Sequence, residues 1–307
     1  MIKTTHENWH SWQYGNNKLF RRQHNTDKFN IVLTPLNRPI KSFKEELILA
    51  AKSVLETFPN IRPTIMFSGG ADSELVLRTY LSIGANPKVC IVRYENDYNL
   101  YDVSYAITVC SMLDVEFDII DFNLQKFYEN DAEQISEIAQ IDRPRALVYC
   151  KFLEMIEHMP IIGEGDPYWV RLDDDYSRKG NWVYRESETF IGWYKYANYL
   201  NKPSVPQFFK WTPELVLSHT KLSWFTKLIN DEYYGKLGTN STKLLGYREI
   251  YPDMIKRAKK TGFEKIDFIV NEFELFLQKK YNGLPYRQSV DMTLNELCVK
   301  ITGKSYP

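Results

Sequence analysis

Apolar residues recur with a helical period in the segment that follows Ser42. A period of three to four residues places them on one face of a helix; they are Phe43, Leu47, Ala50, Val54 and Phe58. Ser42 and Glu45 have the spacing of a capping box, which satisfies backbone N–H groups at the start of a helix. The pattern therefore predicts an amphipathic helix that begins after Ser42 and ends before Pro59.

Short apolar runs alternate with further helical patterns as far as residue 166. The runs typical of strands are 64–67, 88–93, 115–122 and 160–162. The helical patterns between them are 74–82, 102–113 and 147–158. Strands that alternate with helices favour a parallel sheet whose strands are joined by crossover helices. We therefore predict an α/β fold with a mainly parallel sheet that ends near residue 166.

The two ends of the chain differ from this α/β pattern. Two strand-like runs precede it, at 11–22 and 28–34. Aromatic-rich helical segments follow it, including 213–231 and 263–281, with no further clear strand beyond residue 177. We expect this helical part to cover the carboxyl edge of the sheet. The predicted units are a strand-like extension at 1–40, the α/β core at 41–176 and a helical C-terminal part at 177–307.

The composition narrows the class of protein. Lys and Arg together number 39 and balance 39 Asp and Glu residues, so no bulk field draws the chain to nucleic acid or to an anionic membrane. No apolar run approaches the roughly 18 residues of a membrane span, and the first residues lack a signal-peptide pattern. The four cysteines are scattered singly, as is typical of buried free thiols. We expect a soluble cytoplasmic protein without a nucleic-acid or membrane partner.

Residues 68–73, which read SGGADS, have the composition of a phosphate-binding loop between a strand and a helix. The N-terminus of a helix attracts anions, and glycines let an anion approach the backbone. Ser68 and Ser73 add hydroxyl donors. Asp72 would repel a bare phosphate unless a divalent cation lies between them. The loop therefore predicts a phosphate group together with Mg²⁺, in preference to an ordinary glycine-rich turn.

The SGGADS run resembles the SGGxDS loop of the PP-loop ATP pyrophosphatases. Members of that superfamily bind ATP on a doubly wound, Rossmann-like sheet of the adenine nucleotide alpha hydrolase type. They cleave ATP between the α and β phosphates and transfer AMP to a substrate oxygen. The resemblance therefore implies ATP and Mg²⁺ as cofactors, and a small-molecule carboxylate or carbonyl as the substrate that is adenylated.

Later segments are similar to the synthetase half of asparagine synthetases and β-lactam synthetases. Residues 161–166, IIGEGD, resemble that family's SGEGADE segment, although the alanine before the aspartate is missing. Residues 241–245, 250–257 and 259–263 are similar in order and spacing to its late motifs. The resemblance implies an AMP-forming ligase that makes an amide-type bond with ammonia or an amine.

Carried over residue by residue, the resemblance assigns a role to each matching position. The pyrophosphate would be bound by Ser68, Gly69, Gly70 and Ser73, and Mg²⁺ by Asp72 and Asp166. Glu164 would bind or deprotonate the nucleophile, and the catalytic lysines would be Lys243 and Lys260. Lys259 is an alternative to Lys260, because Arg257 lies one position too far from Lys260 for the family's pattern, and Gly246 replaces an arginine.

Simpler interpretations of these residues remain open. Gly165-Asp166-Pro167 is ordinary turn chemistry, so Glu164 and Asp166 could belong to a plain turn. The basic run at 256–260 could be a solvated helix end. Residues 6–10 fit HExxH, the zinc protease signature, but they lack the amphipathic helix that this motif requires.

The nitrogen source and the class of enzyme are also left open. Glutamine-dependent asparagine synthetases carry an N-terminal glutaminase whose nucleophile is the cysteine directly after the initiator methionine, and here that position is Ile2. We expect ammonia, an amine or a separate glutaminase subunit to supply nitrogen. The alternatives are a PP-loop enzyme that modifies nucleobases or tRNA, which the absence of paired cysteines disfavours, and a non-catalytic nucleotide-binding module, which the intact Asp72 and Ser73 disfavour.

Overall fold

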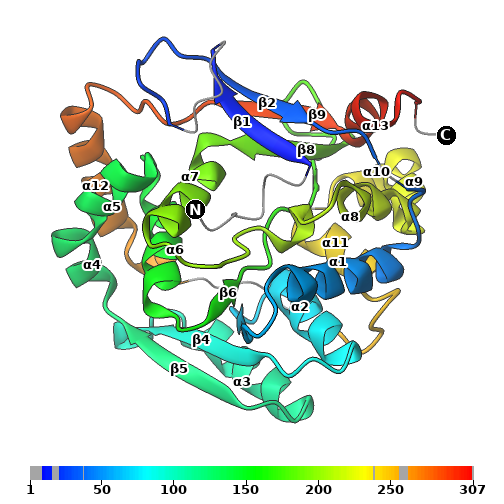
Figure 1. Ribbon diagram of the computed structural model, residues 1–307, viewed down its shortest axis with the longest axis horizontal. Coiled ribbons are helices and arrows are strands. Elements are labelled where there is room, and N and C mark those ends of the chain that lie inside the picture. Colours follow the sequence, from blue (N-terminus) through cyan, green and yellow to red (C-terminus); the bar gives the residue numbers. More distant parts are fainter. Residues whose placement is uncertain (1–8, 16–20, 37, 238, 256–261, 306–307) are drawn as a thin grey trace.

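A parallel four-stranded sheet forms the centre of the α/β part of the chain (Figure 1). The computed structural model describes residues 9–15, 21–36, 38–237, 239–255 and 262–305. The strands lie in the order β5-β4-β3-β6, and each neighbouring pair is parallel. Their bounds are β3 Pro63–Met66, β4 Lys88–Tyr94, β5 Phe117–Phe122 and β6 Met159–Ile161. The predicted α/β class is confirmed, and the sheet is Rossmann-like.

Helices cover both faces of this sheet because its strands carry apolar side chains on both sides. In β3, Ile65 belongs to a core that includes α1, α2 and α3, whereas Met66 belongs to a second core with α4, α5 and α6. Alternate residues of a strand point to opposite faces, so both faces are buried and the sheet is doubly wound. The helices are α1 Phe43–Thr57, α2 Ala71–Ser82, α3 Leu100–Met112, α4 Leu124–Asn130, α5 Ala132–Ala139 and α6 Pro144–Met155.

The predicted helix after Ser42 is present as α1 and has the predicted capping box. The Ser42 hydroxyl accepts a hydrogen bond from the Glu45 backbone N–H, and the Glu45 carboxylate accepts one from the Ser42 N–H. Helix α2 begins at Ala71 rather than at residue 74, because the second half of the SGGADS run forms its first turn. Helices α4 and α5 had no counterpart in the predicted pattern.

A second, antiparallel sheet corrects the expectation that no strand follows residue 177. Its order is β7-β8-β9, with β7 Tyr168–Trp169, β8 Trp182–Ser187 and β9 Ser289–Thr293. Strand β8 has no alternating pattern because it is buried on both faces, and β9 pairs with it from about a hundred residues away in sequence. The N-terminal hairpin, β1 His10–Tyr14 and β2 Phe29–Leu33, packs with this sheet and with α13 Leu294–Thr302 in a third core.

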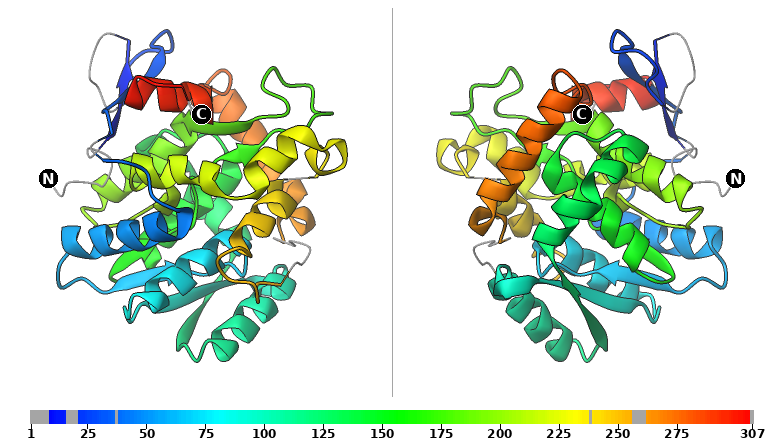
Figure 2. Two further views of the ribbon diagram at one scale, coloured as in Figure 1. Left: turned by 90° about the vertical axis from the view of Figure 1, so that its right-hand side faces the viewer. Right: turned by 90° about the vertical axis from the view of Figure 1, so that its left-hand side faces the viewer.

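The remaining helices belong to the second half of the chain. Figure 2 shows the parallel sheet at one end of the molecule and the hairpin with α13 at the other. The predicted helical segment 213–231 is broken into α8 Pro213–Ser218, a 3-10 turn and α9 Trp224–Asn230. The others are α7 Glu188–Tyr199, α10 Glu232–Gly235, α11 Thr239–Tyr247 and α12 Asp267–Lys280. Within the described ranges, none of the helices has the length and hydropathy of a membrane span.

Candidate active site

The SGGADS loop joins β3 to α2 at the carboxyl edge of the parallel sheet. Gly69 has φ +71°, a left-handed conformation that other residues rarely adopt. The Ser68 hydroxyl accepts a hydrogen bond from the Gly70 N–H at 3.3 Å, and the Ser73 hydroxyl donates to the Gly70 carbonyl at 3.0 Å. The N-cap of α2 is Gly70, which provides no side-chain cap for the first turn. The N–H groups of this turn can therefore donate hydrogen bonds to a bound anion.

The segment 163–166 follows β6 and packs directly against the start of α2. A Cβ atom added at Gly163 would lie 3.0 Å from the carbonyl carbon and oxygen of Asp72 and 3.0 Å from Ser73 Cα. Strands β3 and β6 are neighbours, and the chain leaves β3 toward β4 on the opposite side. The two loops therefore meet at the topological switch point, where open α/β sheets bind their ligands.

Lys243 joins these two loops through its ammonium group. Its Nζ donates to Asp72 Oδ2 at 2.6 Å and to Asp166 Oδ2 at 3.2 Å. Tyr247, one helical turn later on α11, donates its hydroxyl to Asp72 Oδ1 at 2.9 Å. The exposed fractions of the Lys243, Asp72 and Asp166 side chains are 12%, 18% and 8%. The three predicted residues are thus brought together in a largely buried cluster.

Burial and the neighbouring charges shift the pKa values of Asp166 and Lys243 in this cluster. Burial raises the pKa of Asp166 to about 7; Lys243 opposes this rise, and the neighbouring Asp72 and Glu164 carboxylates add to it. Burial disfavours the Lys243 ammonium, but Asp166 and Asp72 outweigh burial and raise the pKa of Lys243. The lysine is therefore protonated, and Asp166 holds a proton more readily than an ordinary aspartate.

The two aspartates that meet at Lys243 make the site suitable for a divalent cation. The carboxylates of Asp72, Glu164 and Asp166 act on the Lys243 ammonium, and those of Glu164 and Asp166 also act on the ammonium of Lys210. In the part of the chain that the structure describes, no three His, Cys, Asp or Glu side chains converge closely enough to hold a metal by themselves. Mg²⁺ commonly takes one or two protein carboxylates and completes its shell with water and substrate phosphates. Asp72 and Asp166 therefore fit the predicted Mg²⁺ ligands when a phosphate ligand is also bound.

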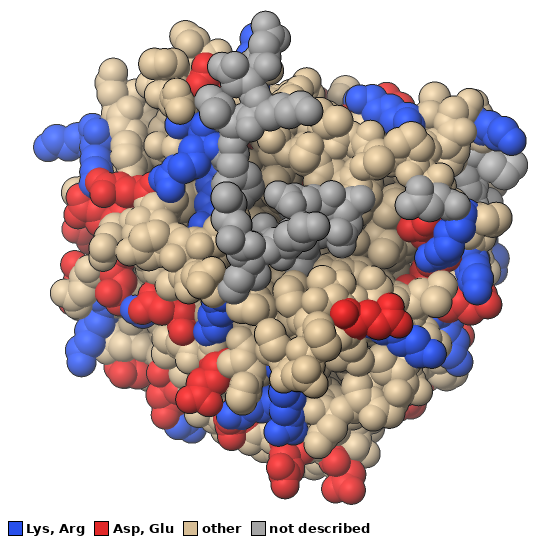
Figure 3. Space-filling model, in the orientation of Figure 1, with Lys and Arg blue, Asp and Glu red and all other residues tan. Residues whose placement is uncertain are grey.

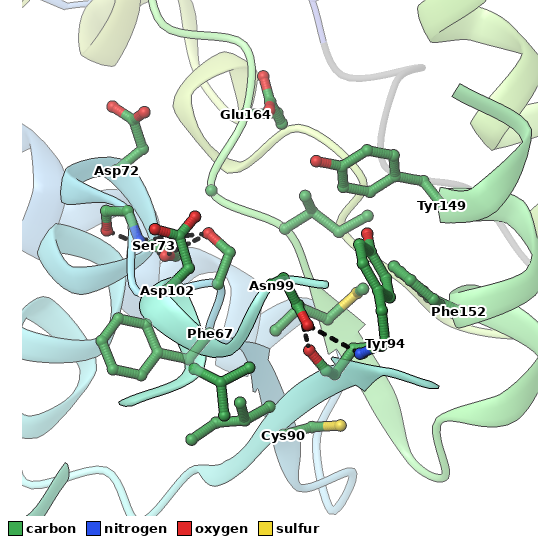
Figure 4. A pocket seen from close by; sticks show the side chains of 18 of the residues that line it. Phe67, Asp72, Ser73, Cys90, Tyr94, Asn99, Asp102, Tyr149, Phe152 and Glu164 are labelled. Carbon is green, nitrogen blue, oxygen red and sulfur yellow. Dashed lines mark hydrogen bonds between the residues drawn. The ribbon is translucent and has the colours of Figure 1, made fainter. Parts of the chain in front are cut away.

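A cavity of about 100 Å³, here called the smaller cavity, opens beside the SGGADS loop (Figure 4). The loop supplies Ser68, Gly70, Asp72 and Ser73 to its wall. Apolar side chains of β4 and aromatic rings complete the wall, including Ile91, Val92, Tyr94, Phe152 and Phe263. This combination of an apolar slot and a phosphate loop suits a nucleoside that carries phosphates.

A cavity of about 740 Å³, here called the larger cavity, lies on the other side of Glu164. Glu164 and Tyr149 line both cavities. Figure 4 shows that the Tyr149 hydroxyl points toward the side of the smaller cavity on which Glu164 lies. Burial, reinforced by Glu164, raises the pKa of Tyr149, so its hydroxyl remains a donor at neutral pH. Asp166 and Lys243 also line the larger cavity. A molecule bound there would meet the same charged cluster as one in the smaller cavity.

The structure leaves two predicted features undescribed. Lys260 and its alternative Lys259 lie outside the described residues, so their assignment stays a prediction. Most of the HExxH match, residues 6–8, also lies outside them. Its last residue, His10, is buried in β1, where its Nδ1 lies 3.1 Å from the Tyr184 hydroxyl and 3.6 Å from Glu186 Oε1. The four cysteines are buried and free, as predicted.

Sequence reasoning missed several residues that line the site. Tyr247 follows Lys243 by four residues, so a helical pattern across 239–247 would have placed both side chains on one face. Lys210 is buried in the wall of the larger cavity, with its Nζ 2.9 Å from Glu186 Oε1. An added Cβ at Gly165 would lie 2.8 Å from Lys210 Cγ, so Lys210 also fixes the position of the 163–166 loop. No local signal in the sequence indicates this contact.

Comparison with known proteins gives weak structural matches only. No protein-family model matches the chain, and no curated protein sequence matches it. Among solved structures, NMN synthetase from Francisella tularensis is 14% identical, with a TM-score of 0.31, and the match covers 75% of this chain and 92% of that chain. An NH3-dependent NAD synthetase from Campylobacter jejuni is also 14% identical, with a TM-score of 0.29 and coverage of 70% and 97%. The assignment of the chain to the α/β Rossmann-like class therefore rests on its own parallel sheet and not on these matches.

Proposed function

We propose that this chain is an ATP-dependent ligase that forms AMP and pyrophosphate. It adenylates a carboxylate or carbonyl of a small molecule and then joins it to ammonia or an amine, in the manner of the asparagine synthetases that the sequence resembles. One observation carries the proposal: the SGGADS loop and the GEGD loop meet at the switch point, and Lys243 bonds to an aspartate from each.

The two cavities suggest how the substrates are placed. The adenine ring of ATP would enter the smaller cavity, and the phosphates would extend over the first turn of α2 toward Asp72. The acceptor would occupy the larger cavity. The α-phosphate and the acceptor would then meet beside Glu164, which lines both cavities.

The residues of the cluster have separate tasks in this scheme. The Lys243 ammonium would lie beside the phosphates and stabilise the negative charge that develops as pyrophosphate leaves. Asp72 and Asp166 would hold Mg²⁺, which when bound neutralises charge on the phosphates. Glu164 would accept a proton from the attacking amine, since it lies where the two cavities join. Lys260 remains the predicted second cation.

The thiols and the surface charges favour this scheme over sulfur transfer or nucleic-acid modification. Burial raises the pKa of Cys90 to about 12 and that of Cys110 to about 11, so neither is a ready thiolate. On the face shown in Figure 3, basic and acidic side chains are interspersed and no large area carries a single sign. A basic stripe of the kind that binds nucleic acid is not seen on this face.

The test is to follow the fate of ATP with the purified full chain. ATP, Mg²⁺ and ammonium would be incubated with a cellular metabolite extract, and AMP and pyrophosphate would be measured while mass spectrometry follows the consumed metabolite. Asp72→Asn should abolish pyrophosphate release, because it removes the metal-binding charge and retains an oxygen for the Tyr247 hydroxyl. Asp175→Asn, in an exposed loop, is the control. Release of ADP and inorganic phosphate by the parent protein would refute the proposal.

A further inference from the structure

The larger cavity is lined by more cationic and aromatic side chains than the reaction proposed beside Glu164 requires. Guanidinium groups of Arg143, Arg185 and Arg287 line it together with the rings of Phe190 and Trp193. These residues come from the start of α6, from β8, from α7 and from the segment before β9. Segments far apart in the sequence therefore deliver these three arginines to one hollow, which a fourth arginine, Arg145 on α6, also lines.

The second sheet places part of this wall in fixed register. Strand β8 pairs with β9 so that Ser187 lies opposite Ser289 and Arg185 lies opposite Asp291. Residues two apart on a strand face the same side, so Arg185 and Ser187 share the face that lines the cavity. Ser187 and Ser289 thus add hydroxyl groups beside the guanidinium of Arg185.

Arg145 pairs with Asp267, and Arg185 and Arg287 also have carboxylate partners. Arg185 makes a bidentate pair with Asp291, at 2.8 and 2.7 Å, and its guanidinium lies over the Tyr168 ring. Arg287 donates from Nε to Asp142 Oδ1 at 3.0 Å and also pairs with Glu274. These pairs hold the two guanidinium groups in place at the wall of the cavity.

Arg143 differs from the other three arginines of the cavity. Its guanidinium makes no ion pair or hydrogen bond with any residue in the described ranges. Burial and the neighbouring Arg287 guanidinium lower the pKa of Arg143; Arg185 acts in the same direction, and the Asp142 and Glu274 carboxylates oppose the shift. Like charges that gather around a hollow repel one another, and a bound anion would relieve this repulsion.

The size of the cavity indicates how large the ligand is. Its volume of about 740 Å³ falls within the range of roughly 300–1,000 Å³ that holds drug-sized molecules. A molecule of a few carbon atoms would leave most of it empty. The rings of Phe190 and Trp193 offer an apolar wall for a flat group of atoms.

We propose that the larger cavity binds an acceptor that has a flat apolar body and two polar groups. One is the carboxylate or carbonyl that is activated, and the other is an anionic group that Arg143, Arg185 and Arg287 bind. The second group is a carboxylate or a phosphate, because both match the planar fork of donors on a guanidinium. This substrate class rests on the proposed function for the placement of the acceptor.

Calorimetric titration of the full chain tests this class without ATP. The probes are 4-hydroxybenzoate, terephthalate and 4-carboxyphenyl phosphate, which share a flat ring and one carboxylate and differ in the opposite group. Terephthalate or 4-carboxyphenyl phosphate should bind more tightly than 4-hydroxybenzoate, and the better of the two identifies the anion. Equal affinity for all three probes overturns the proposal.

A matched pair of variants locates the binding. Arg143→Gln should weaken binding of the better anionic probe by about tenfold, which corresponds to the loss of one charge-assisted hydrogen bond. It should leave the affinity for 4-hydroxybenzoate unchanged. Arg62→Gln removes the same charge from an exposed arginine just before β3, at the amino edge of the sheet, and should change neither. An Arg143→Gln variant that binds every probe like the parent also overturns the proposal.

The outcomes for the two proposals can be separated. If the chain never releases pyrophosphate but Arg143→Gln selectively loses the anionic probes, the proposed reaction is wrong and the anion site stands. If AMP and pyrophosphate form but the three probes bind alike, the ligase stands and the anionic acceptor is wrong.

Discussion

Gly163 approaches Asp72 so closely that a Cβ atom at residue 163 would lie 3.0 Å from the Asp72 carbonyl carbon and oxygen. This contact ties the loop after β6 to the loop after β3. The atoms that would clash belong to the backbone of α2, which cannot turn aside as a flexible side chain can. The geometry of the phosphate loop therefore depends on the absence of a side chain at residue 163.

Gly163→Ala should impair ATP binding more than it impairs folding. The added methyl group would push Glu164 and Asp166 away from Asp72, and overpacking of this kind costs about 1–3 kcal/mol. Gly235→Ala is the control, because its Cβ would meet Leu172 Cδ1 at 2.5 Å, at the end of a flexible side chain. Thermal unfolding and titration with ATP and Mg²⁺ would be measured on both variants. Normal ATP affinity in Gly163→Ala would contradict the assignment of the SGGADS loop as the site that binds the phosphates of ATP.

The hydroxyl of Tyr247 should act on the site through Asp72. Tyr247→Phe removes the hydrogen bond to Asp72 Oδ1 and should weaken binding of ATP with Mg²⁺ by roughly ten- to a hundredfold, since such bonds to charged groups contribute roughly 1.5–3 kcal/mol. Tyr105→Phe removes a comparable bond, from the Tyr105 hydroxyl to Glu74 Oε2 at 3.1 Å. Glu74 is paired with Arg78 inside the protein. Tyr105→Phe should therefore lower stability without changing ATP affinity, and equal effects of both variants on ATP binding would count against the role of Tyr247.

Substitutions in the basic run at 256–260 distinguish a catalytic lysine from a solvated helix end. Lys260→Ala should lower turnover on the order of 10² to 10³-fold with little change in ATP affinity, because its ammonium would act on charge that develops in the transition state. Lys256→Ala on the same run should be nearly neutral. Turnover and ATP affinity would be measured for both variants, and for Lys259→Ala. Small and equal effects of all three changes would favour the solvated helix end.

The local part of the site was predictable from the sequence. The strand, the SGGADS loop and the start of α2 depend on glycines, serines and a short apolar run that are contiguous in the chain. The capping box at Ser42 and Glu45 is equally local. Such features form because neighbouring residues satisfy one another's backbone groups, so the order of residues is sufficient to identify them.

The tertiary part of the site could not be predicted in the same way. Strand β9 is five residues long and is defined by its pairing with β8, so its own sequence carries little signal. The meeting of Arg143, Arg185 and Arg287 depends on three segments whose relative positions are fixed by packing. The bonds from Lys243 to both aspartates cross 171 and 77 residues of chain. Family resemblance suggested the residues but not these contacts.

The raised pKa of Asp166 predicts a change in stability with pH. In the folded chain this pKa is about 7, against 3.8 for an ordinary aspartate. Between these values the folded state binds a proton that the unfolded state has lost, so the free energy of unfolding falls as pH rises from about 4 to about 7. Asp166→Asn removes the titrating group. Its stability relative to the parent should therefore increase across this window and become constant above it.

Urea unfolding of the parent and of Asp166→Asn at about pH 5, 6 and 8 measures this difference. His10 and His219, whose pKa values burial lowers to about 4, change stability in the opposite direction but do so equally in both proteins. Asp175→Asn in an exposed loop should run parallel to the parent. In the presence of ATP and Mg²⁺ the parent should gain more stability at pH 8 than at pH 6, because a cation binds the ionised carboxylate. Asp166→Asn should lose this pH-dependent gain, and parallel profiles for variant and parent would show that Asp166 is neither the titrating group nor a metal ligand.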